Sequence, residues 1–216
     1  MKNPHIYLIA GEPSGDRLGA RLIAALRAIT GGQCQISGVG GPEMEKQGFS
    51  SYFPMSELAV MGFAEVLPRL PNLLKRIRGT VEHIVANNPD VVVTIDSPEF
   101  SFRILKNLRG SNIHLVHYVA PSVWAWKSGR AKKLAKLADH LLTLLPFEPK
   151  YFEREGLPSS FVGHSVLESG ADHGDGVAFR KCHNIPPDAK VLCLLPGSRL
   201  SEVNRILPVF GEVVAS

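Results

Sequence analysis

Short apolar runs and helix-spaced apolar stripes alternate along most of this 216-residue chain. The run VVVTI at residues 91–95 has no polar alternation, which is typical of a strand buried on both faces of a parallel sheet. Comparable runs predict further strands at residues 5–10, 35–39, 113–119, 140–144 and 160–162. Stripes at helical spacing predict the connecting helices at residues 18–29, 70–85, 100–108 and 149–155. The pattern therefore predicts an α/β fold, a Rossmann-like parallel sheet with helices on both faces.

The pattern changes after residue 168. Residues 169–176, SGADHGDG, are rich in glycine and aspartate and are predicted to be a linker. Beyond them the sequence predicts a helix at residues 177–182, a strand at 191–195 and a helix from about residue 201. These elements cannot enclose a core. We therefore expect an N-terminal domain at residues 1–168 and, at 177–216, the truncated start of a second α/β domain.

Composition narrows the function classes only slightly. Hydrophobic residues make up 44% and charged residues 20%, as in ordinary globular proteins, and the net charge is +4. The three cysteines show no paired spacing, which argues against a disulfide framework and a zinc site. No apolar run reaches the roughly 18 residues of a membrane span, so membrane contact is expected to be peripheral. The basic stretches lack interleaved aromatic residues, so nucleic-acid binding is not expected.

The first candidate for chemistry is Asp96, which follows the apolar run at residues 91–95. Ser97 and Pro98 end the strand, so Asp96 is expected in a loop at the carboxyl edge of the sheet, where α/β proteins bind ligands. Aspartate is also a good N-cap, and Asp96 could instead cap the following helix. Position alone leaves both interpretations open.

Two glycine-bearing loops before helices could present backbone N–H groups to a ligand. The first, GEPSGD, contains Gly11, Glu12, Ser14, Gly15 and Asp16, and matches neither a Walker A loop nor a G-x-G-x-x-G fingerprint. It could equally be a tight turn with Ser14 or Asp16 as N-cap. The second contains Gly197, Ser198 and Arg199, whose hydroxyl and guanidinium groups suit a phosphate.

The stripe at residues 70–85 belongs to a basic amphipathic helix that carries Lys75, Arg76 and Arg78. Gly79 is predicted to break it. The helix either packs on the sheet with a solvated charged face or meets anionic lipid headgroups. The preceding apolar segment contains Met55, Val60, Met61 and Phe63, and either fills the core or contacts acyl chains.

A set of motifs spanning nearly the whole chain resembles the lipid-A-disaccharide synthase family. They are AGEPSGD at 10–16, GVGGP at 38–42, ELAVMG at 57–62, IDSPEF at 95–100, HYVAPSVWAW at 117–126, LPFE at 145–148, GH at 163–164, and LPGSR at 195–199 with Glu202. The resemblance implies a GT-B glycosyltransferase, whose two Rossmann-like domains face each other across a cleft. Its implied reaction joins UDP-2,3-diacylglucosamine to 2,3-diacylglucosamine 1-phosphate with inversion, and gives lipid A disaccharide 1-phosphate and UDP.

The resemblance also implies roles for the candidate residues. Asp96 would be the catalytic base, and Arg199 would stabilise the departing UDP, with Gly197, Ser198 and Glu202 at the donor diphosphate. The residues of the GEPSGD loop would line the acceptor side. No metal or other cofactor is implied, and the parent would work at the cytoplasmic face of the inner membrane of a Gram-negative bacterium, with a homodimer as one arrangement.

Most of the donor site would lie outside this chain, so the fragment alone is expected to be inactive. One alternative is a non-catalytic α/β module that binds a phosphorylated lipid or nucleotide, with Asp96 as a helix cap. A weaker third is a lipid-linked nucleotide-sugar epimerase on the same scaffold.

Overall fold

The computed structural model describes residues 3–58, 63–123, 129–168, 170, 173–197 and 200–215. The chain divides into two compact units, Met1–Ser169 and Gly170–Ser216, which are described separately.

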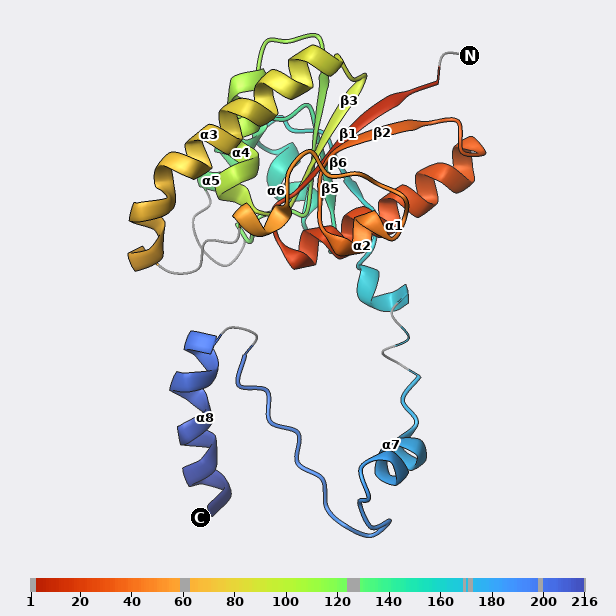
Figure 1. Cartoon of the computed structure of the whole chain (residues 1–216), viewed down its shortest axis with the longest axis vertical. Coiled ribbons are helices and arrows are strands. Elements are labelled where there is room, and N and C mark those ends of the chain that lie inside the picture. Colours follow the sequence, from red (N-terminus) through yellow and green to blue (C-terminus); the bar gives the residue numbers. More distant parts are fainter. Residues whose placement is uncertain are drawn as a thin grey trace. The chain divides into compact units, whose positions relative to one another are not determined.

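The first unit is built on one parallel sheet of six strands (Figure 1). The strands are β1 (His5–Ala10), β2 (Gln35–Val39), β3 (Val91–Ile95), β4 (His114–Tyr118), β5 (His140–Thr143) and β6 (Ser159–Phe161). Their order is β2-β1-β3-β4-β5-β6, and all five neighbouring pairs are parallel. The predicted Rossmann-like α/β fold is confirmed, with each expected strand within about two residues of its observed bounds.

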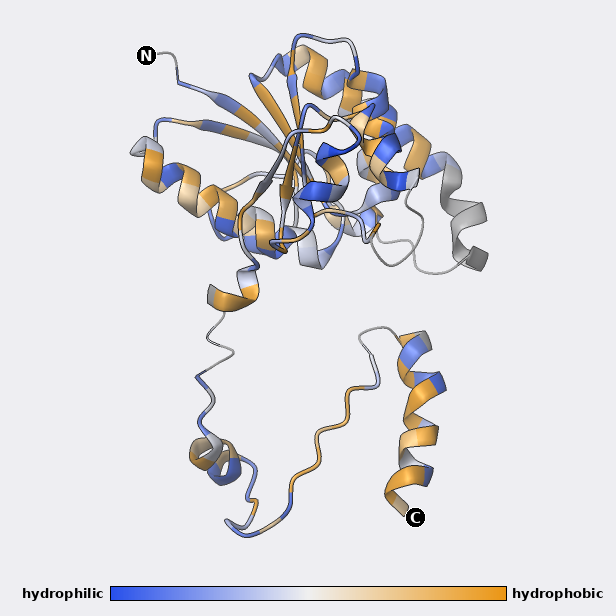
Figure 2. Ribbon diagram, turned by 180° about the vertical axis from the view of Figure 1, so that it is seen from behind, coloured by the Kyte–Doolittle hydropathy of each residue, from blue (hydrophilic) through white to orange (hydrophobic). Residues whose placement is uncertain are grey.

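Helices cover both faces of this sheet. The long helices are α1 (Pro13–Thr30), α3 (Phe63–Asn87) and α4 (Pro98–Leu108), and the shorter elements are α2 (Pro42–Glu45), α5 (Gly129–Ala135), α6 (Pro149–Glu153), η1 (Met55–Leu58) and η2 (Ser165–Glu168). Hydrophobic positions recur along each ribbon, and orange and blue alternate along α1 (Figure 2). This periodicity lets each helix bury one side on the sheet.

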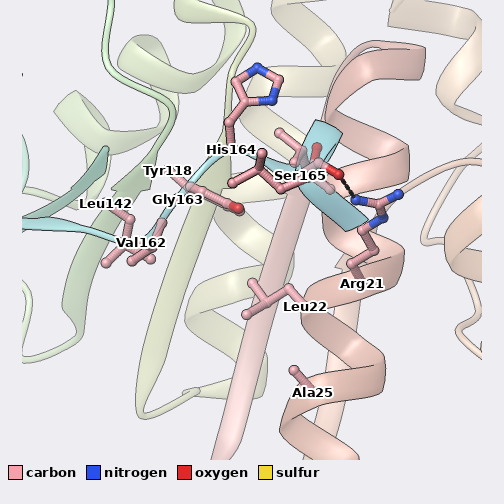
Figure 3. A pocket seen from close by; sticks show the side chains of 11 residues that line it. Arg21, Leu22, Ala25, Tyr118, Leu142, Val162, Gly163, His164 and Ser165 are labelled. Carbon is pink, nitrogen blue, oxygen red and sulfur yellow. Dashed lines mark hydrogen bonds between the residues drawn. The ribbon is translucent and has the colours of Figure 1, made fainter. Parts of the chain in front are cut away.

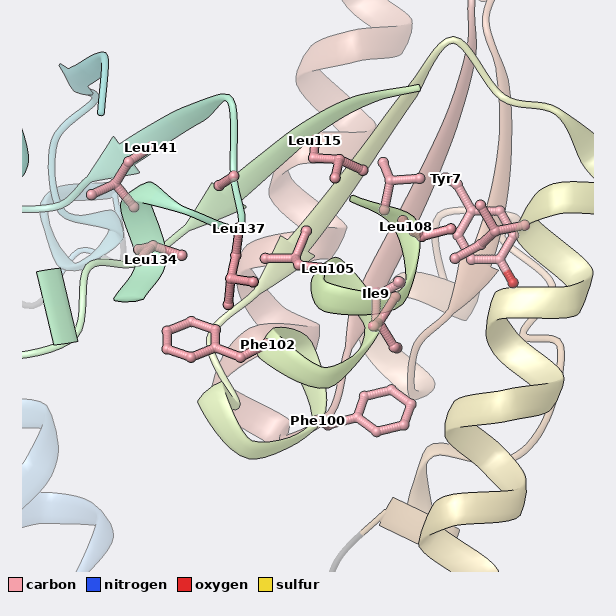
Figure 4. Packing of buried hydrophobic residues seen from close by; sticks show 14 of the residues in the cluster. Tyr7, Ile9, Phe100, Phe102, Leu105, Leu108, Leu115, Leu134, Leu137 and Leu141 are labelled. Carbon is pink, nitrogen blue, oxygen red and sulfur yellow. The ribbon is translucent and has the colours of Figure 1, made fainter. Parts of the chain in front are cut away.

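Two cores form because successive strand residues point to opposite faces. Leu8 and Ala10 of β1 pack with residues of α1 and with Met44 of α2. Tyr7 and Ile9 face the other core, which α3, α4, α5 and α6 cover. Figure 4 shows this second core, where the side chains of β1, α4, β4 and β5 converge. Because β1 and β3 are buried on both faces, their sequences are continuous apolar runs.

Two elements differ from expectation. The predicted break at Gly79 is wrong, since α3 runs unbroken from Phe63 to Asn87. A helical glycine costs only about 1 kcal/mol, and the buried side chains of Ile77 and Ile84 on either side hold the helix to the core. The predicted strand at residues 191–195 is also wrong. That segment is neither strand nor helix, because a strand needs a neighbour to pair with and the described part of its unit offers none.

The second unit contains two helices among its described residues, α7 (Gly176–Cys182) and α8 (Leu200–Ala215). Asp175 caps α7, since its Oδ1 accepts a hydrogen bond of 2.9 Å from the Ala178 N–H. None of the described residues in this unit is buried, and large apolar side chains such as Val177 and Leu195 are about four-fifths exposed. The assignment of residues 177–216 to the start of a second domain remains a prediction.

Candidate functional site

The strand order places a topological switch point at the carboxyl edge of the sheet, between β1 and β3, where open α/β sheets form their ligand crevice. From β1 the chain moves to β2 on one side, and it then returns across β1 to form β3 on the other. Ligands of open α/β sheets bind at such a switch point. The first turn of α1, directly after β1, carries Ser14, and the turn after β3 carries Asp96, so both sequence-predicted candidates lie at this switch point.

Asp96 lies in an unusual backbone turn. Its φ is 52° and that of Ser97 is 47°, so two successive non-glycine residues adopt the left-handed conformation. Asp96 N–H donates to the Tyr118 carbonyl at 2.9 Å, and the Ser101 hydroxyl donates to the Asp96 carbonyl at 2.7 Å. Left-handed non-glycine residues cost of order 1–3 kcal/mol each and cluster at functional sites.

The alternative in which Asp96 caps α4 is wrong, because Ser97 occupies the N-cap position. The Asp96 carboxylate points elsewhere, where its Oδ2 accepts a hydrogen bond of 3.3 Å from the Ser14 hydroxyl. A half-buried carboxylate at the switch point is thus free of a capping role.

The GEPSGD loop divides into exposed and buried residues. Glu12 takes the N-cap position of α1 without a side-chain capping bond, and both Glu12 and Ser14 are exposed. Gly11 and Gly15 are buried against the end of β3. Of the expected acceptor-side residues, the structure therefore presents Glu12 and Ser14 to solvent at the crevice.

Asp16 has a different position from the one expected. Its side chain is 2% exposed, and its two oxygens accept hydrogen bonds of 2.9–3.0 Å from the N–H groups of Gly41, Glu43 and Met44. These N–H groups belong to the first turn of α2 and its N-cap, so Asp16 ties α1 to the β2–α2 loop. Both oxygens are occupied, and Asp16 does not face the crevice as a ligand group.

His117 on β4 lies one strand away from Asp96 but inside the core. Its Nδ1 is 2.8 Å from the Thr94 hydroxyl, its ring meets Phe102 edge-on, and its buried Nε2 has no hydrogen-bond partner among the described residues. Burial lowers the pKa of His117 to about 3. A histidine that holds a proton so weakly is a poor base at neutral pH, so this side chain fixes β3 against β4 instead.

The expected donor-diphosphate loop is described only in part. Gly197 has a φ of 117°, and a Cβ built on it would lie 2.6 Å from Oε2 of Glu202, so the loop folds closely over the first turn of α8. Ser198 and Arg199 lie outside the described residues. Their placement at a phosphate remains a prediction.

The basic surface of α3 is more nearly neutral than its sequence suggests. Arg76 forms two hydrogen bonds of 2.7 Å with Glu57 and lies 4.7 Å above the ring of Phe53. Arg78 pairs with Glu82 at 2.8 Å, which leaves Lys75 as an exposed cation beside these pairs. Together with Tyr52 and Gly79, the residues of this helix line a hollow of about 380 Å³.

The structure describes only some of the predicted acyl-contact residues. Met55 is half-buried and packs against the core on the α1 side of the sheet, so the core interpretation fits it. Val60 and Met61 lie outside the described residues. Phe63 begins α3, and nothing is described of its side chain.

A groove of about 380 Å³ between α1 and the ends of β4 to β6 was not anticipated from the sequence (Figure 3). Leu22 and Leu142 line its apolar walls, and the Arg21 guanidinium donates to the Ser165 carbonyl at its rim. The Gly163–His164 motif lies in its wall, but the rest of the lining comes from separate elements, so no contiguous stretch of sequence describes the groove.

Within the described ranges, no group of three or more His, Cys, Asp or Glu side chains is arranged to hold a metal ion. Across the same ranges, no helix is both long and apolar enough to cross a membrane.

Solved structures determined with UDP or with UDP-GlcNAc share this architecture. The UDP co-structure of S. aureus MnaA aligns with a TM-score of 0.58 and 13% identity, over 84% of this chain and 50% of that one. UDP-GlcNAc 2-epimerase from Neisseria meningitidis, bound to UDP-GlcNAc, aligns with a TM-score of 0.54 and 12% identity, over 84% of this chain and 52% of that one. At such identities the likeness shows the fold alone, and it agrees with the predicted Rossmann-like α/β architecture.

The sequence itself gives the family. The family model described as lipid-A-disaccharide synthetase matches residues 6–216, and the chain belongs to that family. Lipid-A-disaccharide synthase of Rhodospirillum centenum is 59% identical over the whole chain, and that of Paramagnetospirillum magneticum is 55% identical over 97% of it. The chain spans about half the length of these curated relatives, 55% and 54% respectively.

Proposed function

We propose that the parent protein of this chain is a glycosyltransferase of lipid A biosynthesis, which joins UDP-2,3-diacylglucosamine to 2,3-diacylglucosamine 1-phosphate. Family membership supports the reaction class. The observation that carries the catalytic assignment is the Asp96 carboxylate, held in a left-handed turn at the switch point and without a capping role. On this proposal residues 1–168 bind the acceptor, and residues 177–216 begin the donor-side domain.

The proposed step is a direct displacement with inversion. Asp96 takes the proton of the acceptor hydroxyl as its oxygen attacks the anomeric carbon of the donor, and UDP leaves with the bonding electrons. A positioned base contributes typically about 10²–10⁴-fold to such a step. On this proposal the exposed Glu12 and Ser14 belong to the acceptor side of the active site.

No metal is required on this proposal, because protein groups stabilise the charge on the leaving diphosphate. Arg199 supplies the cation, with Gly197, Ser198 and Glu202 in the same loop and helix start. A guanidinium suits this role because it can donate two parallel hydrogen bonds to phosphate oxygens.

We expect the full-length parent to release UDP from UDP-2,3-diacylglucosamine only when 2,3-diacylglucosamine 1-phosphate is present. The measurement is UDP release coupled to mass detection of the disaccharide, in the presence of a metal chelator. A non-catalytic binding module would bind a substrate without releasing UDP, and an epimerase would convert the donor without needing the acceptor. Either result would overturn the proposal.

The proposed substrates carry acyl chains, so we also propose that the parent works at the cytoplasmic face of the inner membrane as a peripheral protein. The exposed Lys75 and Arg78 of α3 would face anionic headgroups, and the apolar segment containing Val60, Met61 and Phe63 would contact acyl chains. A basic residue near an anionic surface is worth about 1 kcal/mol. The homodimer remains one arrangement that the family resemblance suggests.

This membrane proposal predicts that the double variant Lys75→Glu with Arg78→Glu loses binding to anionic vesicles, and that wild-type binding falls with added salt. Arg76 is left unchanged, because its pairing with Glu57 and its contact with Phe53 make it structural. Lys46→Glu, at another exposed lysine, is the matched control. Vesicle sedimentation measures the effect, and equal binding of all variants to neutral and anionic vesicles would assign α3 to the protein core alone.

A further inference from the structure

The residues on either side of Ser14 place its side chain beside that of Asp96. A Cβ built on Gly11 would lie 2.7 Å from the Ser97 hydroxyl oxygen, and one built on Gly15 would lie 3.1 Å from the Ile95 carbonyl. Both glycines therefore let the start of α1 press against the end of β3. Pro13 occupies the first turn of α1, where its fixed φ suits the helix start. Close packing on both sides leaves Ser14 little freedom relative to Asp96.

The hydroxyl of Ser14 has a partner outside its own helix. It donates to Oδ2 of Asp96 at 3.3 Å, across 82 positions of the sequence. Serine near a helix start usually bonds a neighbouring backbone N–H, and the N-cap position here belongs to Glu12. The bond to Asp96 therefore joins the first turn of α1 to the turn that follows β3.

We propose that Ser14 is a positioning residue, which holds the Asp96 carboxylate through Oδ2 and leaves Oδ1 for the acceptor hydroxyl. The inference rests on the proposed function and assigns one role within it. A carboxylate with a free side-chain torsion samples several orientations, and a bond to one oxygen selects the orientation in which the other faces the crevice. Ser14 neither gives up nor accepts a proton in the reaction.

This role predicts a loss in turnover without a loss in substrate binding. Ser14→Ala in the full-length parent should lower kcat by roughly 10- to 100-fold, since a misplacement of about 1 Å can cost about 100-fold. The KM for the acceptor should remain unchanged, because Ser14 does not itself bind substrate. Ser14→Thr keeps the hydroxyl and should restore most of kcat.

Two controls separate this role from a structural one. Ser14 is exposed, so Ser14→Ala should unfold at the wild-type temperature. Ser50→Ala, at another exposed serine, should leave both kcat and stability unchanged. A Ser14→Ala variant with wild-type kcat would overturn the proposal.

A double-mutant cycle tests whether Ser14 acts through Asp96. In the Asp96→Asn background, Ser14→Ala should cause no further loss, because the group that it positions has already been disabled. A full additional loss, or a rise in acceptor KM, would make Ser14 a substrate-binding residue and overturn the positioning role. Failure of the proposed function is distinct, since it would appear as the absence of acceptor-dependent UDP release by the wild-type parent.

Discussion

Replacing Asp96 by asparagine in the full-length parent should lower kcat by about 10²–10⁴-fold while the protein folds normally. Asparagine has nearly the same size but lacks the basic oxygen that would accept the proton of the acceptor hydroxyl. It is also well suited to the left-handed conformation of this position, where φ is 52°. Steady-state kinetics and thermal unfolding of the same variant measure the two effects.

Two comparison variants make the Asp96 result specific. Asp96→Ala should lose activity to the same degree but also lose stability, by about 1–2 kcal/mol, because alanine is disfavoured in the left-handed region. Glu99→Gln removes an exposed carboxylate from the first turn of α4 and should change neither property. An Asp96→Asn variant that keeps more than roughly a tenth of wild-type kcat would end the assignment of Asp96 as the base.

Replacing Asp16 by alanine should destabilise the first unit by about 3 kcal/mol or more. The change leaves the N–H groups of Gly41, Glu43 and Met44 without their acceptor, and an unsatisfied buried group costs about 1–3 kcal/mol. For a domain of this size the melting temperature should fall by roughly 6–12 °C. Differential scanning calorimetry of the first unit within the intact chain provides the measurement.

An asparagine at position 16 should give an intermediate loss, since it keeps one acceptor oxygen but turns an NH₂ group toward backbone donors. Glu45→Ala, an exposed acid on α2, is the matched control and should leave the melting temperature unchanged. If Asp16→Ala has wild-type stability but has lost acceptor binding, Asp16 contacts the ligand and its structural role is wrong.

Much of the fold was predictable because the inner strands carry no polar alternation. Val92, Val93 and Ile95 are buried on both faces of the sheet, which leaves a continuous apolar run in the sequence. The uninterrupted α3 was not predictable. Gly79 is a local signal for a helix break, whereas the packing that keeps the helix intact involves residues distant in the sequence. The segment at residues 191–195 has strand-like composition, but pairing partners decide whether a strand forms.

The site was predictable in position but not in roles. The ends of β1 and β3 could be placed at one edge from sequence, and so could Ser14 and Asp96. Residues two apart on a helix point about 200° away from each other, so only one of Ser14 and Asp16 can face Asp96. Which one does so depends on where the β2–α2 loop lies, and that position comes from tertiary packing around Gly41 and Met44.

The position of β1 between β2 and β3 also sets an order of events during synthesis. β1 leaves the ribosome before either of its neighbours, and one of them, β3, ends about 85 residues after β1 does. At roughly 5–20 residues per second, β1 waits several seconds before that partner exists. Its apolar backbone can pair with β2 in the meantime, but the opposite edge stays open until residue 95 emerges. The nascent chain therefore passes through an aggregation-prone stage, and slower elongation before β3 should lengthen it.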